Sequence, residues 1–264
     1  MSHVDRADRD PREIIVVPHA DVALSHQPPV PARLLPATVT TFAVRFETDD
    51  YVAGEQRFLD VPLPAGLCAA APRRRLHYRA GRFCAVHALQ GLGVAGAVAL
   101  AWQGTNLPPA WPDGVTGSIT HTDGFACAAV AWSRHVKAIG VDSERMASSA
   151  RAGAVSPLVC VEEEIHRGLS AGLDRPAAVT LAFSIKEAVF KCLYPFVGRY
   201  FGYLDVSLDG LDATIDGAGG TFCVTVTRAL GRQIPGRMAV TGSFGIDGDL
   251  VHAAVCLQAR RGNA

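Results

Sequence analysis

Two carboxylates stand two residues apart in an apolar segment near the middle of the chain. Residues 138–144 read AIGVDSE, which is typical of a strand, and they include Asp142 and Glu144. Positions i and i+2 of a strand point to the same face, so we expect the two carboxylates to lie side by side. Like charges at that distance repel unless a cation lies between them, and a divalent cation with oxygen ligands is the natural partner. The alternative is a polar strand end that faces water.

A third acidic side chain lies in residues 183–191, which read FSIKEAVFK. Glu187 and Lys191 are four residues apart, so they share one face of a predicted helix. In the simpler interpretation, Ser184 and Glu187 form a capping box, and Glu187 and Lys191 form a surface ion pair.

Two more segments contain residues suited to binding an anion. Residues 117–121 (GSITH) predict a short strand that ends at His121, a residue that could be a ligand, a base, a phosphate contact or simply structural. A basic segment follows residue 72, and guanidinium groups bind phosphate through paired hydrogen bonds. Its arginines, which could equally form a solvated helix start, are Arg73, Arg74, Arg75, Arg79 and Arg82.

The elements that must position these residues follow from periodicity and turn signals. Apolar spacing predicts helices over residues 76–89, 162–168 and 179–193. Alternating and β-branched runs predict strands, and proline-rich residues 27–36 predict an irregular loop. The expected strands are 13–17, 39–47, 117–119, 125–133, 137–145, 204–208, 221–228, 237–244 and 250–257, with a turn at 122–124. This order favours an α+β protein with mixed or antiparallel sheets.

Composition excludes several classes of protein. Lys plus Arg and Asp plus Glu both number 25, so no excess charge points to nucleic acid or to an acidic membrane. The seven cysteines form no CxxC pair, which argues against a zinc ribbon and suits a reducing compartment. The polar N-terminus does not resemble a signal peptide, and the apolar runs are too short to span a membrane. We therefore expect a cytoplasmic protein.

A glycine-rich segment, residues 91–96 (GLGVAG), fits the G-x-G-x-x-G pattern of nicotinamide oxidoreductases. Its context does not fit, because a basic helix precedes it where that fold needs a strand. The nearest candidate for a ribose contact, Asp113, lies in a Trp-Pro-Asp-Gly turn. We interpret these glycines as the end of a helix and the turn that follows.

The order and wording of the segments resemble one known family. GVDSE (140–144) followed by FSIKEAVFK resembles the paired signatures of the 4′-phosphopantetheinyl transferase superfamily. RRLHYRAGR (74–82), WPDGVTGSITH (111–121) and CLYPFVGRYFGYLDVSL (192–208) resemble the subgroup typified by enterobactin synthase component D. This resemblance implies Mg²⁺-dependent transfer of the phosphopantetheine arm of coenzyme A to a serine of an apo acyl or peptidyl carrier protein. The other product is 3′,5′-ADP, and the implied setting is nonribosomal peptide, siderophore or polyketide biosynthesis.

The resemblance also implies a metal site. It assigns Asp142, Glu144 and Glu187 to Mg²⁺ beside the coenzyme A pyrophosphate, with Lys191 next to the same phosphates. Glu187 is our candidate for the base that accepts the serine proton, directly or through a water molecule. An intact set of these residues argues against the alternative of a non-catalytic scaffold that only binds coenzyme A.

The remaining contacts that the resemblance implies are to phosphate. Arg74 and Arg82 should meet phosphates of coenzyme A, and Thr120 and His121 should lie near its 3′-phosphate. Relatives often have a basic residue shortly before the Trp-Pro pair, whereas this chain has residues 106–109 (NLPP) there.

The fold implied by the resemblance is a pseudo-dimer of two similar α/β halves with coenzyme A in the cleft between them. We expect an N-terminal half at residues 1–136, including an N-terminal extension, and a C-terminal half with the metal site at residues 137–264. Such a pseudo-dimer suggests that a monomer suffices. Ser143, between the two acidic residues, should point away from the metal.

Overall fold

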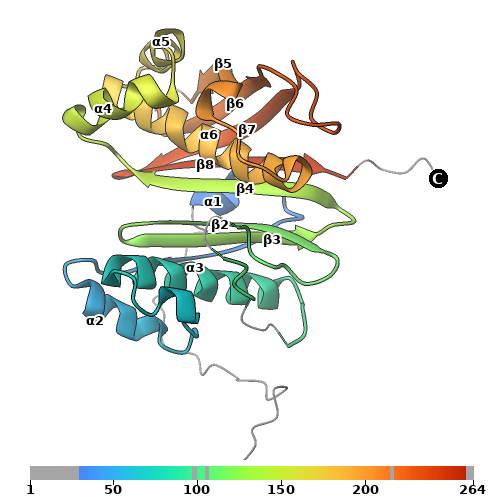
Figure 1. Cartoon of the computed structure of the whole chain (residues 1–264). Coiled ribbons are helices and arrows are strands. Elements are labelled where there is room, and N and C mark those ends of the chain that lie inside the picture. Colours follow the sequence, from blue (N-terminus) through green and yellow to red (C-terminus); the bar gives the residue numbers. More distant parts are fainter. Residues whose placement is uncertain (1–29, 97–99, 105–106, 215–216, 260–264) are drawn as a thin grey trace, which may run out of the picture.

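The computed structural model describes residues 30–96, 100–104, 107–214 and 217–259, and it stacks two antiparallel sheets between two layers of helices (Figure 1). This arrangement confirms the predicted α+β fold class, with every strand pairing antiparallel. The strand expected at residues 13–17 and Asn106 of the NLPP segment lie outside the described residues.

The smaller sheet has three strands in the order β1-β3-β2, namely β1 (Thr40–Arg45), β2 (Val115–Thr122) and β3 (Phe125–Trp132). Helix α3 (Pro72–Gly91) covers one face of this sheet (Figure 1). Gly124 in the β2–β3 turn has φ 78°, a conformation that favours glycine, which confirms the predicted turn. Three short helical segments precede α3: α2 (Tyr51–Glu55), η1 (Gln56–Phe58) and η2 (Ala65–Leu67).

The larger sheet has five strands in the order β4-β8-β7-β6-β5. They are β4 (Val136–Arg145), β5 (Val206–Ala213), β6 (Gly219–Val226), β7 (Ala239–Asp247) and β8 (Leu250–Gln258). Its helices are α4 (Ser149–Val159), α5 (Glu162–Ser170) and α6 (Arg175–Val197), followed by η3 (Tyr203–Asp205). Among the described residues, no helix is long and apolar enough to cross a membrane.

Some sequence predictions were wrong about helices. The predicted loop at 27–36 contains the short helix α1 (Val30–Arg33), and neither α2 nor α4 was predicted. Helix α6 begins at Arg175, where Asp174 accepts a hydrogen bond from the Ala177 amide. The capping-box interpretation of Ser184 is therefore wrong, because Ser184 lies inside the helix. The GLGVAG glycines do follow a helix, α3, as expected.

Helix α6 and strand β4 approach each other unusually closely at Gly140. A Cβ atom on Gly140 would lie 1.8 Å from the Ala188 carbonyl oxygen and 2.8 Å from the Cys192 nitrogen. Only a residue without a side chain lets the two backbones touch in this way. The contact brings the helix with Glu187 and Lys191 against the strand with the two neighbouring carboxylates.

The two sheets meet along the edge strands β2 and β4, which exchange no regular ladder of backbone hydrogen bonds. Instead, the Ser118 hydroxyl accepts the Val141 N–H at 3.1 Å, and the Thr120 hydroxyl accepts the Ser143 N–H at 2.8 Å. These bonds satisfy two amides of an edge strand that lies buried between the sheets. The β2 and β4 site segments are thereby held side by side.

We predict that Gly140→Ala strongly destabilises the protein. The added methyl group overlaps backbone atoms of α6 that cannot rotate away, so we expect a loss of about 3 kcal/mol or more. Chemical denaturation followed by circular dichroism measures the loss.

The matched control is Gly153→Ala in α4, because a Cβ atom there meets nothing within 4 Å. We expect this variant to gain up to about 1 kcal/mol, since alanine favours a helix over glycine. Equal stability of the two variants would show that the α6–β4 contact tolerates more space than the structure has.

Candidate active site

Asp142 is the most buried of the three predicted metal ligands. Its side chain is 4% exposed, and Oδ1 accepts a 2.6 Å hydrogen bond from Lys191 Nζ. Lys191 also donates to the Val141 carbonyl at 3.2 Å. Burial lowers the pKa of Lys191, but the opposing effects of the Asp142 and Glu187 charges and of the hydrogen bond to Asp142 outweigh burial. The pKa of Lys191 is therefore above its ordinary value. The simpler interpretation of a surface ion pair between Glu187 and Lys191 is therefore wrong, because Lys191 pairs with the buried Asp142.

Negative charge is crowded around Asp142. Burial, and next the charge of Asp142, raise the pKa of Glu144 to about 8, and Glu187 contributes in the same direction. The second oxygen of Asp142, Oδ2, is buried and has no hydrogen-bond partner among the residues that the structure describes. A buried carboxylate oxygen without a partner is costly, and a bound cation would relieve that cost.

Glu187 has a partner that the sequence did not indicate. The Tyr203 hydroxyl, from η3, donates to Glu187 Oε1 at 2.6 Å. Burial and this hydrogen bond raise the pKa of Tyr203 above its ordinary value. The two residues line a small pocket together with Phe190 and Tyr200. The only available signal was the aromatic run at residues 200–203 that follows α6.

The three carboxylates fit a magnesium ion by their chemistry. Mg²⁺ takes oxygen ligands, usually one or two carboxylates completed by phosphate and water. Within the described residues, no three acidic, histidine or cysteine side chains are already gathered closely enough to enclose an ion. Lys191 and Tyr203 each bond one carboxylate oxygen instead. The assignment of Asp142, Glu144 and Glu187 as metal ligands stays a prediction.

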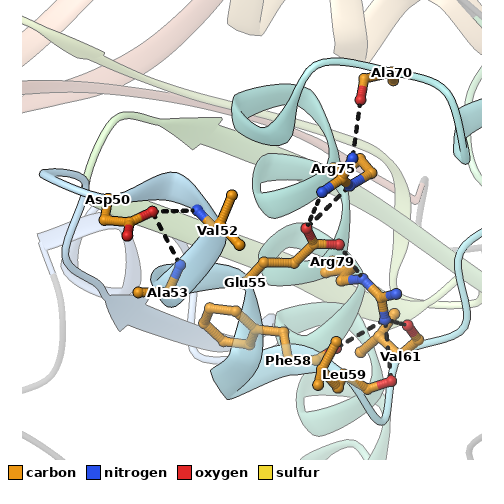
Figure 2. Close-up of polar contacts among 10 residues, drawn as sticks. All are labelled: Asp50, Val52, Ala53, Glu55, Phe58, Leu59, Val61, Ala70, Arg75 and Arg79. Atoms are coloured by element: carbon orange, nitrogen blue, oxygen red, sulfur yellow. Dashed lines mark hydrogen bonds and ion pairs between the residues drawn. The ribbon is translucent and has the colours of Figure 1, made fainter.

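Two of the five arginines at the start of α3 have a structural role (Figure 2). Arg75 and Arg79 both bind the buried carboxylate of Glu55, at 2.9 Å and 2.8 Å. Arg79 also donates to the carbonyl oxygens of Phe58, Leu59 and Val61. This cluster fastens α2 and the chain after it to α3, so these two side chains are not available to a ligand.

A third arginine is held at the β2–β3 turn. Asp123 Oδ1 accepts hydrogen bonds from Arg73 at 2.9 Å, from the Tyr51 hydroxyl at 3.2 Å and contacts His77 Nε2 at 3.0 Å. The start of α3 is thereby fixed beside the end of β2, where His121 lies. The rings of His77 and His121 are 5.2 Å apart.

The two remaining arginines are the two predicted to contact coenzyme A. Arg74 is exposed and has no ion-pair partner among the described residues. The Arg82 side chain lies over the Tyr78 ring at 5.2 Å, and its buried Nη1 has no hydrogen-bond partner in the described part of the chain. Burial lowers the pKa of Arg82. A buried guanidinium nitrogen without a partner is well suited to receive a phosphate oxygen.

Positive charge surrounds His121 at the end of β2. Burial, followed by the charges of His77 and Lys191, lowers the pKa of His121 to about 3, and Arg74 contributes as well. Thr120, the residue before it, is 2% exposed and its hydroxyl faces β4. Of these residues, Lys191 also contacts the Asp142 carboxylate of β4. The phosphate contacts of Arg74, His121 and Lys191 stay predictions.

Ser143 lies on the opposite side of β4 from its acidic neighbours. Its hydroxyl is fully buried and forms a 2.8 Å hydrogen bond with His252 Nδ1 on β8. Burial lowers the pKa of His252 to about 4. This geometry is what the alternation of side chains along a strand requires.

Comparison with known proteins identifies the family. The family model described as the 4′-phosphopantetheinyl transferase N-terminal domain matches residues 63–131, and the 4′-phosphopantetheinyl transferase superfamily matches residues 138–224. The 4′-phosphopantetheinyl transferase Svp of Streptomyces mobaraensis is 33% identical over 237 residues, which cover 88% of this chain and 91% of that protein. The chain belongs to the 4′-phosphopantetheinyl transferase family. The resemblance and enzyme class predicted from the sequence are thereby confirmed.

Two other relatives extend the comparison. Enterobactin synthase component D of Salmonella typhi is 36% identical over 160 residues, which cover 61% of this chain and 65% of that protein. The 4′-phosphopantetheinyl transferase PptT of Mycobacterium tuberculosis is 32% identical over 188 residues, which cover 67% and 75%. Family membership supports coenzyme A as substrate and a carrier protein as acceptor.

We predict that Glu55→Ala destabilises the protein by about 3 kcal/mol, because it leaves two largely buried guanidinium groups without their shared anion. Thermal unfolding measured by differential scanning fluorimetry reports the effect.

Glu162→Ala provides the control, because Glu162 forms an exposed ion pair with Arg175. Exposed pairs contribute little, so its melting temperature should stay close to that of the wild type. If Glu55→Ala melts like this control, the arginine cluster does not fasten α2.

Proposed function

We propose that this chain transfers the 4′-phosphopantetheine arm of coenzyme A to a carrier-protein serine with Mg²⁺ bound by Asp142, Glu144 and Glu187. The observation that supports this best is the buried Asp142 Oδ2, which has no partner and lies beside Glu144, whose pKa is raised to about 8. A divalent cation would give the Asp142 oxygen a partner and would stabilise the charged form of Glu144. No described protein side chain serves that oxygen.

The residues predicted to contact phosphate suit the rest of coenzyme A. Arg74, Arg82 and His121 would bind its phosphates, and Lys191 would lie by the pyrophosphate. Anionic and cationic groups side by side match a substrate that brings both phosphates and a phosphate-bound metal. The predicted place of Thr120 near the 3′-phosphate stays a prediction, and its hydroxyl is bonded to β4 in the structure.

In the proposed reaction, the carrier serine oxygen attacks the β-phosphorus of coenzyme A. The bond from that phosphorus to the oxygen bridging to 3′,5′-ADP breaks in line, and 3′,5′-ADP takes up the electron pair. Glu187 would accept the serine proton, directly or through a water molecule. Tyr203 holds Oε1 of this carboxylate and so fixes the direction of Oε2. Bound Mg²⁺ would polarise the pyrophosphate and offset its growing charge.

Lys191 would change partner during binding. In the structure its ammonium group is held by Asp142 Oδ1 and the Val141 carbonyl. A cation on the Asp142 carboxylate would weaken that attraction and leave Lys191 to face the pyrophosphate. The same residue thereby stabilises the site before substrate binds and the phosphate charge afterwards.

The wider setting is also proposed. The acceptor would be a peptidyl or acyl carrier of nonribosomal peptide, siderophore or polyketide biosynthesis, and the enzyme would act in the cytoplasm as a monomer. The N-terminal half would span residues 1–136 and the C-terminal half residues 137–264. In support, the chain passes from the smaller to the larger sheet between Trp132 and Val136.

We predict that Asp142→Asn lowers the rate of transfer by at least about 100-fold, because it removes the anionic oxygen aimed at the metal. The measurement is intact mass spectrometry of apo carrier proteins incubated with coenzyme A and Mg²⁺, where modification adds one phosphopantetheine group. Removal of Mg²⁺ with EDTA should abolish the wild-type reaction.

Asp212→Asn on β5 is the control, since Asp212 is exposed at the far edge of the larger sheet. It should keep the wild-type rate. A wild-type rate in Asp142→Asn would exclude the proposed metal site. Coenzyme A binding without modification of any carrier would favour the non-catalytic scaffold instead.

A second prediction concerns Arg82→Met. Losing the guanidinium, whose Nη1 lacks a partner among the described residues, should weaken coenzyme A binding about tenfold or more, as expected when a charged hydrogen bond to phosphate is removed. Replacement of a poorly paired buried cation by an apolar side chain should leave the melting temperature of the ligand-free protein unchanged or raised. Isothermal titration calorimetry and thermal unfolding give the two values. Unchanged affinity would mean that Arg82 does not contact coenzyme A.

A further inference from the structure

The Thr120 hydroxyl faces β4, the strand that contains the predicted metal ligands Asp142 and Glu144. Its hydroxyl accepts the Ser143 N–H at 2.8 Å and lies 3.5 Å from Asp142 Oδ1, toward which it can donate. The residue is 2% exposed. A hydroxyl has one hydrogen, and the carboxylate is the acceptor within reach. Both contacts of Thr120 are therefore made to β4, one to the backbone and one to a predicted metal ligand.

Ser118 makes the corresponding bond two residues earlier. Its hydroxyl accepts the Val141 N–H at 3.1 Å, on the same edge of β4. Ser118 is buried, and among the described residues the hydrogen bond recorded for its hydroxyl is to the strand backbone, whereas Thr120 adds the contact with the carboxylate. Two neighbouring hydroxyls thus join the sheets in the same way, and that of Thr120 also contacts a predicted metal ligand, Asp142.

We propose that Thr120 is a positioning residue that sets the direction of the Asp142 carboxylate for the metal. The inference rests on the function proposed above, because it concerns the same magnesium site. The Ser143 amide held by Thr120 adjoins Asp142 directly, so the bond fixes the peptide from which the carboxylate projects. The donated hydrogen bond then competes with Lys191 for Oδ1, while Oδ2 stays buried without a hydrogen-bond partner among the described residues.

The physical consequence is a preorganised ligand. Groups that hydrogen-bond to a metal ligand orient it, and their removal typically costs 10–100-fold in metal affinity. Without the Thr120 hydroxyl, Lys191 alone would hold Asp142, and the carboxylate could turn both oxygens toward the ammonium group. Metal binding would then have to break that ion pair.

The test compares Thr120→Val, which keeps the shape and removes the hydroxyl, with Thr120→Ser, which restores it. Mn²⁺ is titrated into each coenzyme A-bound protein and followed by electron paramagnetic resonance. We expect Thr120→Val to weaken Mn²⁺ binding about tenfold or more. Thr120→Ser should bind Mn²⁺ like the wild type.

Ser118→Ala is the matched control for stability. It also leaves one buried β4 amide without its acceptor, so its melting temperature should fall about as far as that of Thr120→Val. Its Mn²⁺ affinity should stay within about twofold of the wild type, because Ser118 does not contact the carboxylate. Equal losses of Mn²⁺ affinity in both variants would overturn the proposal in favour of a purely structural role.

A second readout separates positioning from phosphate contact. The transfer rate is measured with coenzyme A and with dephospho-coenzyme A, which lacks the 3′-phosphate. Positioning of Asp142 predicts the same fold loss for Thr120→Val with both donors. A loss that is confined to coenzyme A would overturn the proposal and assign Thr120 to the 3′-phosphate.

The outcomes also distinguish this inference from the proposed function. A wild-type enzyme that works without any divalent cation would overturn both. A cation-dependent wild type with normal Mn²⁺ affinity in Thr120→Val would overturn the role of Thr120 alone. If Thr120→Val does not fold, Thr120→Cys replaces it, and its weaker hydrogen bonding should give a smaller loss of Mn²⁺ affinity in the same direction.

Discussion

The backbone contact between α6 and β4 at Gly140 is the constraint on which the site depends. A helix packed on a sheet normally keeps its distance because side chains fill the space between them. Here the position has no side chain, and a Cβ atom would overlap the Ala188 carbonyl. Lys191 on the helix consequently reaches the Asp142 carboxylate on the strand within one hydrogen bond. One missing side chain therefore decides whether two distant charged segments form one site.

Opposite faces of α6 then have different roles. Lys186 is buried and donates to Glu164 and to the Val159 carbonyl, both at 2.8 Å. Glu164 in turn accepts the Leu208 amide, so this pair ties the end of α4, the start of α5 and β5 to the helix. Glu187, the residue after Lys186, lies on a partly exposed side of the helix and accepts a hydrogen bond from Tyr203. The helix is thus anchored by one ion pair, while its other charged group, Glu187, is the one proposed to act on substrate.

The basic start of α3 shows how one residue type is divided between structure and binding. Arg75 and Arg79 both pair with Glu55 (Figure 2). Arg73 pairs with Asp123. Arg74 is exposed, Arg82 has a buried Nη1 without a partner among the described residues, and both are proposed to bind a ligand. The fixed arginines make the free ones more useful, because a rigid helix start presents them without a further loss of conformational entropy. Family resemblance had singled out these two arginines, whereas charge and spacing could not.

The sequence by itself determined the family, the fold class, most of the strands and the three helices α3, α5 and α6. These follow from local patterns, such as the alternation in β4 or the repeat of apolar residues in α6, which need only neighbouring residues to be read. It also placed Asp142 and Glu144 on one face and Ser143 on the other, because strand geometry fixes that alternation. The tertiary structure alone decided the partners. Lys191 pairs with Asp142, Tyr203 with Glu187 and Thr120 with Ser143 because sheet stacking and the Gly140 contact bring distant segments within hydrogen-bonding distance. No periodicity along the chain records a contact between segments so far apart.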